Sequence, residues 1–265
     1  CLVTSDPITG AAEGVGELAV HVACNDIAAN GGTPVGVQVV LLLPEHTKEE
    51  HIHQIMEDIQ TTAASLDVEV LGGHTEITSR VGDPVVSITA IGRAPKDRYV
   101  TSKGARPGDD IIITKGLGIE ATAILARDFG HMLPFSVTDE QILTMTKQLS
   151  VVPEGLLAAE HGVHAMHDIT EGGLLGAIRE VCQTAQVGAE IREVDAAVSE
   201  LTKSICAHFG LDPLSLLSSG SMLIVAPRGQ ELIDKLSEID VPAFLVGKIV
   251  EGRHPVLIRE TGERQ

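Results

Sequence analysis

Short runs of aliphatic and β-branched residues alternate along this chain with longer segments that repeat apolar residues at helical spacing. The first helical segment runs from Glu17 to Ala29, and a β-rich run from Val37 to Leu43 follows it. Further along the chain, Ile111-Ile112-Ile113 begins a second series of the same kind. This alternation predicts an α/β fold, in which helices cover the faces of parallel or mixed sheets.

The composition supports the same fold class. Aromatic residues make up 2% of the 265 residues and Trp is absent, so Val, Ile, Leu and Ala must build the core. Such a core suits layers of helix on sheet, with strands buried between helices. The chain is 43% hydrophobic and 21% charged, an ordinary globular mixture that fits one large domain or two modest ones.

A break in the alternation lies between Arg93 and Gly108. This segment holds two prolines, two glycines and five Lys or Arg residues, and it shows no apolar period. Proline, glycine and charge without periodicity are typical of a linker between domains. We therefore predict an N-terminal domain over residues 1–98 and a C-terminal domain over residues 99–265.

Charge and cysteine usage narrow the classes of function. A net charge of −18 argues against a nucleic-acid partner, which requires clustered Lys and Arg. The sequence has neither an apolar run long enough to span a bilayer nor a signal-peptide pattern. The four cysteines are far apart and form no C-x-x-C pair, so we expect reduced thiols in a cytoplasmic protein.

Local signals mark several helix boundaries. Thr47-Lys48-Glu49-Glu50 has the spacing of a capping box, and the segment from Thr138 to Gln141 can cap a helix that reaches Leu149. Lys115-Gly116-Leu117-Gly118 predicts a tight turn into a helix from Ile119 to Arg127.

Four polar clusters follow the apolar runs and carry the chemistry that the sequence suggests. Their carboxylates are suitable ligands for Mg²⁺, and their glycines allow a phosphate to approach backbone N–H groups. No P-loop and no dinucleotide-binding glycine motif is present, so a bound ATP would be held in another way. The clusters are Thr4-Ser5-Asp6, Asn25-Asp26, Gly72-Gly73-His74-Thr75-Glu76 and Asp168-Ile169-Thr170-Glu171-Gly172-Gly173.

Each cluster also has an ordinary structural interpretation. Asp6 before a proline is a common turn residue, and the Gly72-Gly73 pair at the end of a β-run can be a hairpin turn. Thr170 can cap the helix that begins at the second glycine pair, although a glycine-rich helix N-terminus is also an anion site. Asp26 lies among apolar neighbours near a helix end, where a partly buried carboxylate requires a cation or donors.

Histidines are a weaker signal. The pair His51 and His53 points in different directions on a helix, and Gly162 interrupts the set formed by His161, His164 and His167. No cysteine lies close to either group in the sequence, so we do not predict a zinc site.

In combination, the clusters resemble those of the aminoimidazole ribonucleotide (AIR) synthase superfamily. This superfamily includes AIR synthase, thiamine-monophosphate kinase, selenophosphate synthetase and the hydrogenase maturation protein HypE. The resemblance covers nearly the whole chain, and its C-terminal part is most similar to the HypE branch. The matching segments are Val3 to Asp6, Gly16 to Ala19, Asn25 to Pro34, Leu71 to Glu76, Asp168 to Leu174, Leu211 to Leu214 and Ser219 to Leu223.

The resemblance implies a two-domain α/β (α+β) protein that binds ATP and Mg²⁺. It implies an N-terminal mixed sheet that pairs with the sheet of a dimer mate, and a C-terminal sheet flanked by helices. Members use ATP to phosphorylate an oxygen of an amide, formyl or phosphate group. We therefore expect a homodimer that acts on a small substrate, with a maturation protein as a further partner.

Residue roles follow from the same resemblance. It implies Mg²⁺ ligands at Asp6 and Asp26. His74 stands where relatives usually carry Asp or Glu, so either Glu76 substitutes as a further ligand or one metal site is missing. It implies catalytic roles for Asp26 and Asp168. The residues that it implies for ATP binding are Asn25, Gly72, Gly73, His74, Thr75, Gly172 and Gly173.

Three hypotheses for the function follow. The first is an ATP-dependent, Mg²⁺-using enzyme similar to the HypE branch, and the second is a small-molecule kinase similar to thiamine-monophosphate kinase. The third is a nucleotide-binding paralogue without catalytic activity, which His74 favours. Because Cys1 lies inside a strand-like run and no Met precedes it, we expect that an upstream segment was removed or left out.

Overall fold

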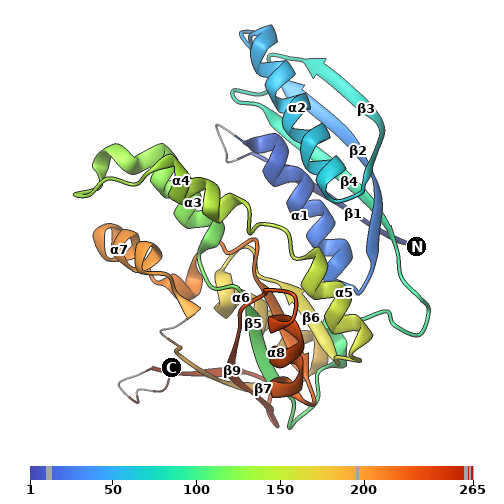
Figure 1. The fold of residues 1–265 in the computed structure, drawn as a ribbon, viewed down its shortest axis with the longest axis vertical. Helices are drawn as coiled ribbons and strands as arrows, with labels where there is room; N and C mark the ends of the chain where they lie inside the picture. The colour runs from blue at the N-terminus through green and yellow to red at the C-terminus, as the bar shows by residue number, and fades with distance from the viewer. Residues whose placement is uncertain (10–13, 195–196, 260–261, 263, 265) are drawn as a thin grey trace. The chain divides into compact units, whose positions relative to one another are not determined.

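The computed structural model describes residues 1–9, 14–194, 197–259, 262 and 264 of the chain (Figure 1). By their internal contacts the residues group into two compact units. The first is Cys1–Ala28 with Gly32–Pro95, and the second is Ala29–Gly31 with Lys96–Gln265. The domain boundary that the sequence predicts after residue 98 stays a prediction.

The first unit is built on a mixed sheet, as the sequence predicts. In the described residues this sheet has four strands in the order β1-β4-β2-β3. Strands β2 and β3 are parallel, and β4 pairs antiparallel with both β1 and β2. The strands are β1 (Leu2–Ile8), β2 (Thr33–Leu43), β3 (Glu69–Ile77) and β4 (Val85–Arg93), and the helices are α1 (Val15–Ala29) and α2 (Glu49–Ser65).

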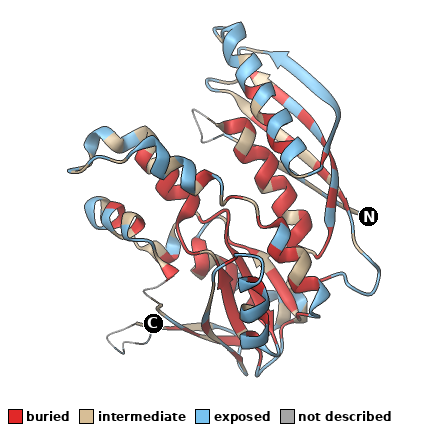
Figure 2. Ribbon diagram, viewed as in Figure 1, coloured by how far each residue is buried: buried red, intermediate tan, exposed pale blue. Residues whose placement is uncertain are grey.

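Alternation along the strands buries one face of this sheet. Val86, Ile88 and Ala90 of β4 are fully buried, while the residues between them are half-buried. The opposite face retains exposed aliphatic side chains such as Val3 and Val40. Strand β3 is exposed at every residue, and Figure 2 shows it in the exposed colour along its length. The sheet therefore has one closed face, one partly apolar open face and one uncovered edge.

One local prediction and two of the ordinary structural interpretations in this unit are wrong. The N-cap of α2 is Lys48, without a side-chain cap bond, so the capping box at Thr47 does not form. Strand β3 continues through the Gly72–Glu76 cluster to Ile77 because pairing with β2 satisfies its backbone. Asp6 lies inside β1, paired with Ile88, and is not a turn residue.

The second unit contains a larger mixed sheet. Among the described residues it has six strands in the order β10-β7-β9-β5-β8-β6. Only β10 and β7 pair in parallel; the other neighbours are antiparallel. The strands are β5 (Asp110–Thr114), β6 (Ala165–Asp168), β7 (Gly188–Arg192), β8 (Met222–Ala226), β9 (Ala243–Val250) and β10 (Pro255–Ile258).

Helices flank this sheet, again as predicted. Thr138 and Gln141 form the predicted capping box of α4, although this helix ends at Thr146 and not at Leu149. The N-cap of α6 is Gly172, so Thr170 does not cap that helix. The helices are α3 (Ile119–Phe129), α4 (Asp139–Thr146), α5 (Val152–Glu160), α6 (Gly173–Ala185), α7 (Glu200–Phe209) and α8 (Gly229–Ser237).

Helix α6 forms the centre of the core in the second unit. Its buried side chains include Leu174, Ile178 and Val181, which pack with Ile113 of β5 and Leu223 of β8. Figure 2 shows these strands almost entirely in the buried colour. Within the described residues, no helix is both long enough and apolar enough to cross a membrane.

Candidate functional site

Two of the predicted metal ligands meet in the first unit. Thr4 and Asp6 lie on the buried side of β1, because they pair with the buried residues Ala90 and Ile88 of β4. The Thr4 hydroxyl lies 2.5 Å from Oδ2 of Asp26 on α1 and 3.3 Å from Oδ2 of Asp6. The strand and the helix thus bring both carboxylates close to one hydroxyl.

The chemistry of this group fits a hard divalent cation. A hydroxyl carries one proton, so Thr4 can donate to only one of the two carboxylates at a time. The neighbouring negative charges of Asp6 and Asp26 repel each other unless a cation lies between them. Carboxylate and hydroxyl oxygens are the ligands that Mg²⁺ prefers. Asn25, which precedes Asp26 on α1, is 1% exposed.

The remaining cluster of the first unit lies at the other edge of the sheet. Gly73 of β3 shares a row with Asp6, because Asp6 pairs with Ile88, Ile88 with Val39 and Val39 with Gly73. Three strand spacings separate the ends of this row, about 14 Å. Within one chain, the structure therefore does not bring the β3 cluster to the Asp6 and Asp26 carboxylates.

The side chains of the β3 cluster also divide between the two faces. His74 pairs with Val40 and Glu76 with Leu42, so both point to the open face of the sheet. Thr75 pairs with the buried Leu41 and points to the other face. Glu76 therefore lies at the opposite edge of the sheet from Asp6 and points to the opposite face.

Close packing explains one glycine of this cluster. A Cβ on Gly73 would lie 1.8 Å from the carbonyl oxygen of Val39, so β2 leaves no space for a side chain there. Gly72 has φ +141° and open space around it. Contact of either glycine with ATP stays a prediction.

The cluster predicted in the second unit lies where three strand ends meet. Asp168 ends β6, is 8% exposed and pairs with Met222 at the start of β8. The N–H of Met222 donates to Oγ1 of Thr114, the last residue of β5, at 2.9 Å. Because β5 and β6 both run antiparallel to β8, their carboxyl ends lie at the same edge of the sheet.

The glycine pair after Asp168 makes the turn into α6. Gly172 and Gly173 have φ of +79° and +60°, which favour glycine. A Cβ on Gly173 would lie 2.6 Å from the carbonyl oxygen of Leu214. Gly173 therefore has a packing role that the sequence did not reveal, while ATP contact of the pair stays a prediction.

His167, next to Asp168, is held by two acceptors. Its Nδ1 lies 2.7 Å from the Asp168 carbonyl oxygen and its Nε2 lies 3.0 Å from Oε2 of Glu180. Burial lowers the pKa of His167, but the hydrogen bond to the Asp168 carbonyl and the charges of Asp168 and Glu180 outweigh it and raise the pKa. The geometry favours an imidazolium that donates from both nitrogens.

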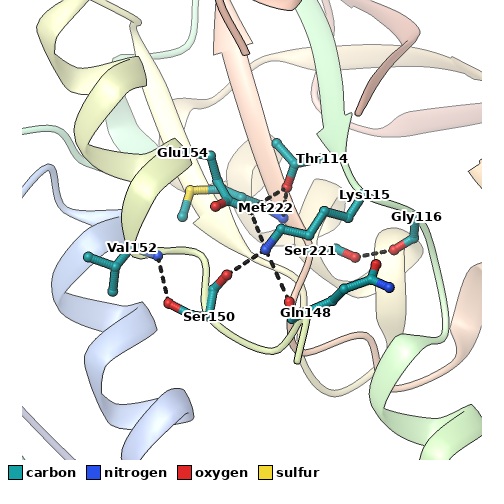
Figure 3. Close-up of polar contacts among 9 residues, drawn as sticks. All are labelled: Thr114, Lys115, Gly116, Gln148, Ser150, Val152, Glu154, Ser221 and Met222. Atoms are coloured by element: carbon teal, nitrogen blue, oxygen red, sulfur yellow. Dashed lines mark hydrogen bonds and ion pairs between the residues drawn. The ribbon is translucent and has the colours of Figure 1, made fainter. Parts of the chain in front are cut away.

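A buried ion pair that the sequence did not predict fixes the turn after β5 (Figure 3). The Lys115 ammonium lies 2.7 Å from Oε1 of Glu154 on α5, and the two side chains are 9% and 0% exposed. The ammonium also donates to the carbonyl oxygens of Gln148 at 3.0 Å and Ser150 at 2.5 Å. Burial lowers the pKa of Lys115, and the Glu154 carboxylate opposes this effect.

Neighbouring bonds connect this pair to the strand ends. Thr114 Oγ1 donates to Oε1 of Glu154 at 3.1 Å while accepting from Met222, and the Ser221 hydroxyl donates to the Gly116 carbonyl. Lys115 has φ +58°, a conformation that costs a non-glycine residue about 1–2 kcal/mol. The sequence signal for this network was a charged residue between an apolar strand and a glycine turn.

Within the described residues, no group of three or more His, Cys, Asp or Glu side chains is arranged to hold a metal ion. The three predicted Mg²⁺ ligands Asp6, Asp26 and Glu76 likewise do not meet within one chain. Two of them, with Thr4, form the incomplete oxygen site of the first unit.

Comparison with known proteins gives matches over nearly the whole chain. Residues 2–94 match the N-terminal domain, and residues 106–260 the C-terminal domain, of AIR synthase related proteins. A putative hydrogenase expression/formation protein of Methanocaldococcus jannaschii is 27% identical over 226 residues, which are 85% of this chain and 66% of that protein. Carbamoyl dehydratase HypE of Azotobacter vinelandii is 27% identical over 253 residues, 93% of this chain and 73% of that protein.

The fold matches that of solved structures as well. A crystal structure of the hydrogenase maturation protein HypE in complex with ATP has a TM-score of 0.86 at 22% identity, covering 99% of this chain and 83% of that one. Against the curated relatives, the chain spans about two thirds of their length, from 62% to 73% among the first few.

Proposed function

Because the chain belongs to the AIR synthase related family in both its N-terminal and its C-terminal domain, we propose that it is an ATP-dependent, Mg²⁺-using enzyme of the HypE branch. Its reaction phosphorylates an oxygen of an amide, formyl or similar group on a small substrate or carrier group. The observation that carries the proposal is the pair of carboxylates around the Thr4 hydroxyl.

In this proposal the first unit holds the nucleotide. Asp6 and Asp26 bind Mg²⁺, and Thr4 orients whichever carboxylate accepts its proton. The buried Asn25, next to Asp26 on α1, orients Asp26 or contacts a phosphate. When bound, Mg²⁺ and ATP supply the phosphoryl group and neutralise its developing charge. The chain therefore needs no nucleophile of its own.

The predicted phosphate-binding residues and a further metal ligand lie on β3. Gly72, Gly73 and Thr75 line the phosphates, and His74 and Glu76 contribute from the open face. Because one chain keeps β3 about 14 Å across the sheet from Asp6, a second copy has to supply this strand to a complete site.

The uncovered edge and open face favour such a homodimer. Every residue of β3 is exposed, including Leu71 at 54% and Ile77 at 57%, and Val3 on the open face is 64% exposed. Exposed strands of this kind pair readily with another chain. A chain of a solved HypE–HypF complex has the same fold, with a TM-score of 0.87, which supports a maturation protein as a further partner.

The second unit carries the residues that the proposal assigns to the substrate. Asp168 at the end of β6 acts as the second catalytic carboxylate, and the Gly172-Gly173 turn shapes the approach to it. The buried bonds around Thr114 and Lys115 keep these strand ends fixed. A rigid frame is what oriented transfer to a small substrate requires.

Calorimetric titration of ATP, with and without Mg²⁺, tests the proposal. We expect metal-dependent binding by the wild type and its loss in Asp26→Asn, which keeps the size of the side chain but removes its charge. Asp83→Asn is the matched control, because Asp83 is exposed and lies outside every cluster. Absence of ATP binding by the wild-type dimer, or equal binding by both variants, would contradict the proposal.

Product analysis then separates the activities. Release of inorganic phosphate with ADP supports transient activation of a substrate oxygen, as proposed here. A phosphate that stays on the product identifies a small-molecule kinase instead. ATP binding with neither product identifies a nucleotide-binding paralogue without catalysis.

A further inference from the structure

A histidine to which the proposed reaction gives no role stands beside the candidate catalytic carboxylate. His167 and Asp168 are the last two residues of β6, and the Asp168 side chain keeps 11% of its surface exposed at the strand end. Successive side chains of a strand point to opposite faces of the sheet. At this strand end, however, Nδ1 of His167 lies 3.9 Å from Oδ1 of Asp168. The imidazole is therefore close enough for its charge to act on the carboxylate.

Two hydrogen bonds fix the imidazole in this position. Nδ1 lies 2.7 Å from the carbonyl oxygen of Asp168, and Nε2 lies 3.0 Å from Oε2 of Glu180 on α6. Ala165, on the same face of β6 as His167, belongs to the core cluster that includes Leu174 of α6, so this face of the strand is directed toward that helix. Carbonyl and ionised carboxylate oxygens only accept, so both ring nitrogens carry a proton when both bonds form.

The charges around β6 favour this charged form of the ring. Strand β8, the short helical turn Ser102–Gly104 and α6 pack against β6. Strand β8 has no charged residue, the turn carries the exposed Lys103, and α6 carries the exposed Arg179 and Glu180. Glu180 bonds the ring, and Asp168 places a second negative charge beside it. Burial lowers the pKa of the histidine, but the bond to the Asp168 carbonyl and these two charges outweigh it and raise the pKa.

A positive charge at this distance affects what Asp168 can do. Burial favours the neutral form of a carboxyl group, whereas a neighbouring cation favours the ionised form. Asp168 is 8% exposed, so the imidazolium counteracts the effect of its burial. An ionised carboxylate only accepts hydrogen bonds, whereas a protonated carboxyl group can donate one. The charge of His167 therefore favours the accepting role for Asp168.

We propose that His167 is a positioning residue, which holds Asp168 as an ionised carboxylate that accepts an N–H or O–H of the substrate. This inference deepens the proposed function, since it rests on the assignment of Asp168 to the substrate. The bond to the Asp168 carbonyl fixes the main chain of the strand end, and the ring charge acts on the side chain. Glu180, whose side chain is 64% exposed, holds the ring from the outside. The site thus selects a substrate group that carries a hydrogen-bond donor.

NMR titration of the histidine rings in the whole chain tests the coupling without ATP or substrate. Asp168→Asn keeps the size of the side chain but removes its charge, and it should lower the pKa of His167 by about one pH unit or more. Asp139→Asn is the matched control, because Asp139 is an exposed carboxylate in the first turn of α4. This control should leave the His167 titration unchanged.

The reciprocal measurement follows the ¹³C-labelled carboxyl carbon of Asp168, since the coupling between two titrating groups acts equally in both directions. His167→Gln removes the positive charge and should raise the pKa of Asp168 by about one pH unit or more, whereas His167→Arg retains a cation and should reverse most of this rise. A purely structural role for His167 would not distinguish Gln from Arg in this way.

Three results would overturn the proposal. They are a His167 titration that Asp168→Asn leaves unchanged, an Asp168 pKa that is equal in the wild type and in His167→Gln, and an Asp168 pKa that is equal in His167→Gln and in His167→Arg. Because no nucleotide is present in these titrations, failure of ATP binding at Asp26 is a separate result.

Discussion

Replacing Lys115 by Met is expected to destabilise the second unit strongly. The change leaves the Glu154 carboxylate fully buried without its cation, and it leaves the Gln148 and Ser150 carbonyls without their donor. Breaking a buried ion pair from one side costs about 3–5 kcal/mol. The strain of the positive φ at position 115 is the same for Lys and for Met, so it cancels when the two variants are compared.

Removing both charges should cost much less than the two single changes together. In Lys115→Met with Glu154→Gln, the amide oxygen can still accept from Thr114, and no unpaired charge stays buried. We expect a coupling energy of about 2–3 kcal/mol between the two positions. Urea unfolding followed by circular dichroism measures it, because the chain has no Trp and a single Tyr.

The chain offers a matched control. Lys235 and Glu238 form an ion pair of nearly the same length, 2.8 Å against 2.7 Å, but their side chains are 46% and 63% exposed. Lys235→Met should cost about 0.5 kcal/mol or less, since solvent screens exposed pairs. If Lys115→Met costs no more than Lys235→Met, or if the coupling is near zero, the assignment of a cation-dependent Glu154 is wrong.

Two further predictions concern the turn that leads into α6. Because its pKa is raised, His167 contributes stability fully below about pH 6.5 and loses it as pH rises through the folded-state pKa. His167→Gln should therefore be destabilised by about 1–2 kcal/mol at pH 6, and urea unfolding between pH 6 and 9 should show this gap closing; a constant gap would argue against the imidazolium. Gly173→Ala should lower stability by about 2–4 kcal/mol, because the Cβ meets the Leu214 carbonyl at positive φ, whereas Gly172→Ala should cost about 1 kcal/mol. Thermal melting compares the two, and equal losses would show that the carbonyl contact is unimportant.

Periodicity in the sequence was sufficient to predict the layers of helix and sheet in the fold. The apolar spacing of α1 and the aliphatic runs of β5 and β8 indicate elements that bury a face whatever their partners are. Local chemistry was less reliable. Thr138 caps its helix as predicted while Thr47 does not, because a cap also depends on where tertiary packing lets the helix begin.

The candidate site was predictable in part. The sequence placed Asp26 on a partly buried helix end and Asp168 at a strand end, and both positions are confirmed. It could not show that β3 runs through Gly73, since glycine pairs usually end a strand, and the close approach of Val39 explains Gly73 alone. The partner of Glu154 could not be predicted because it lies about 40 residues away in sequence, at Lys115.

The left-handed backbone at Lys115 links two positions in the evolution of this family. Glycine would relieve the strain of that turn, and once it replaced the lysine nothing would neutralise a carboxylate at position 154. Selection should therefore exchange the two residues together, through intermediates that are less stable than either end point. Homologues are expected to carry both the lysine at position 115 and the glutamate at position 154, or neither of them. The residue after β5 should therefore divide the family into two groups of sequences.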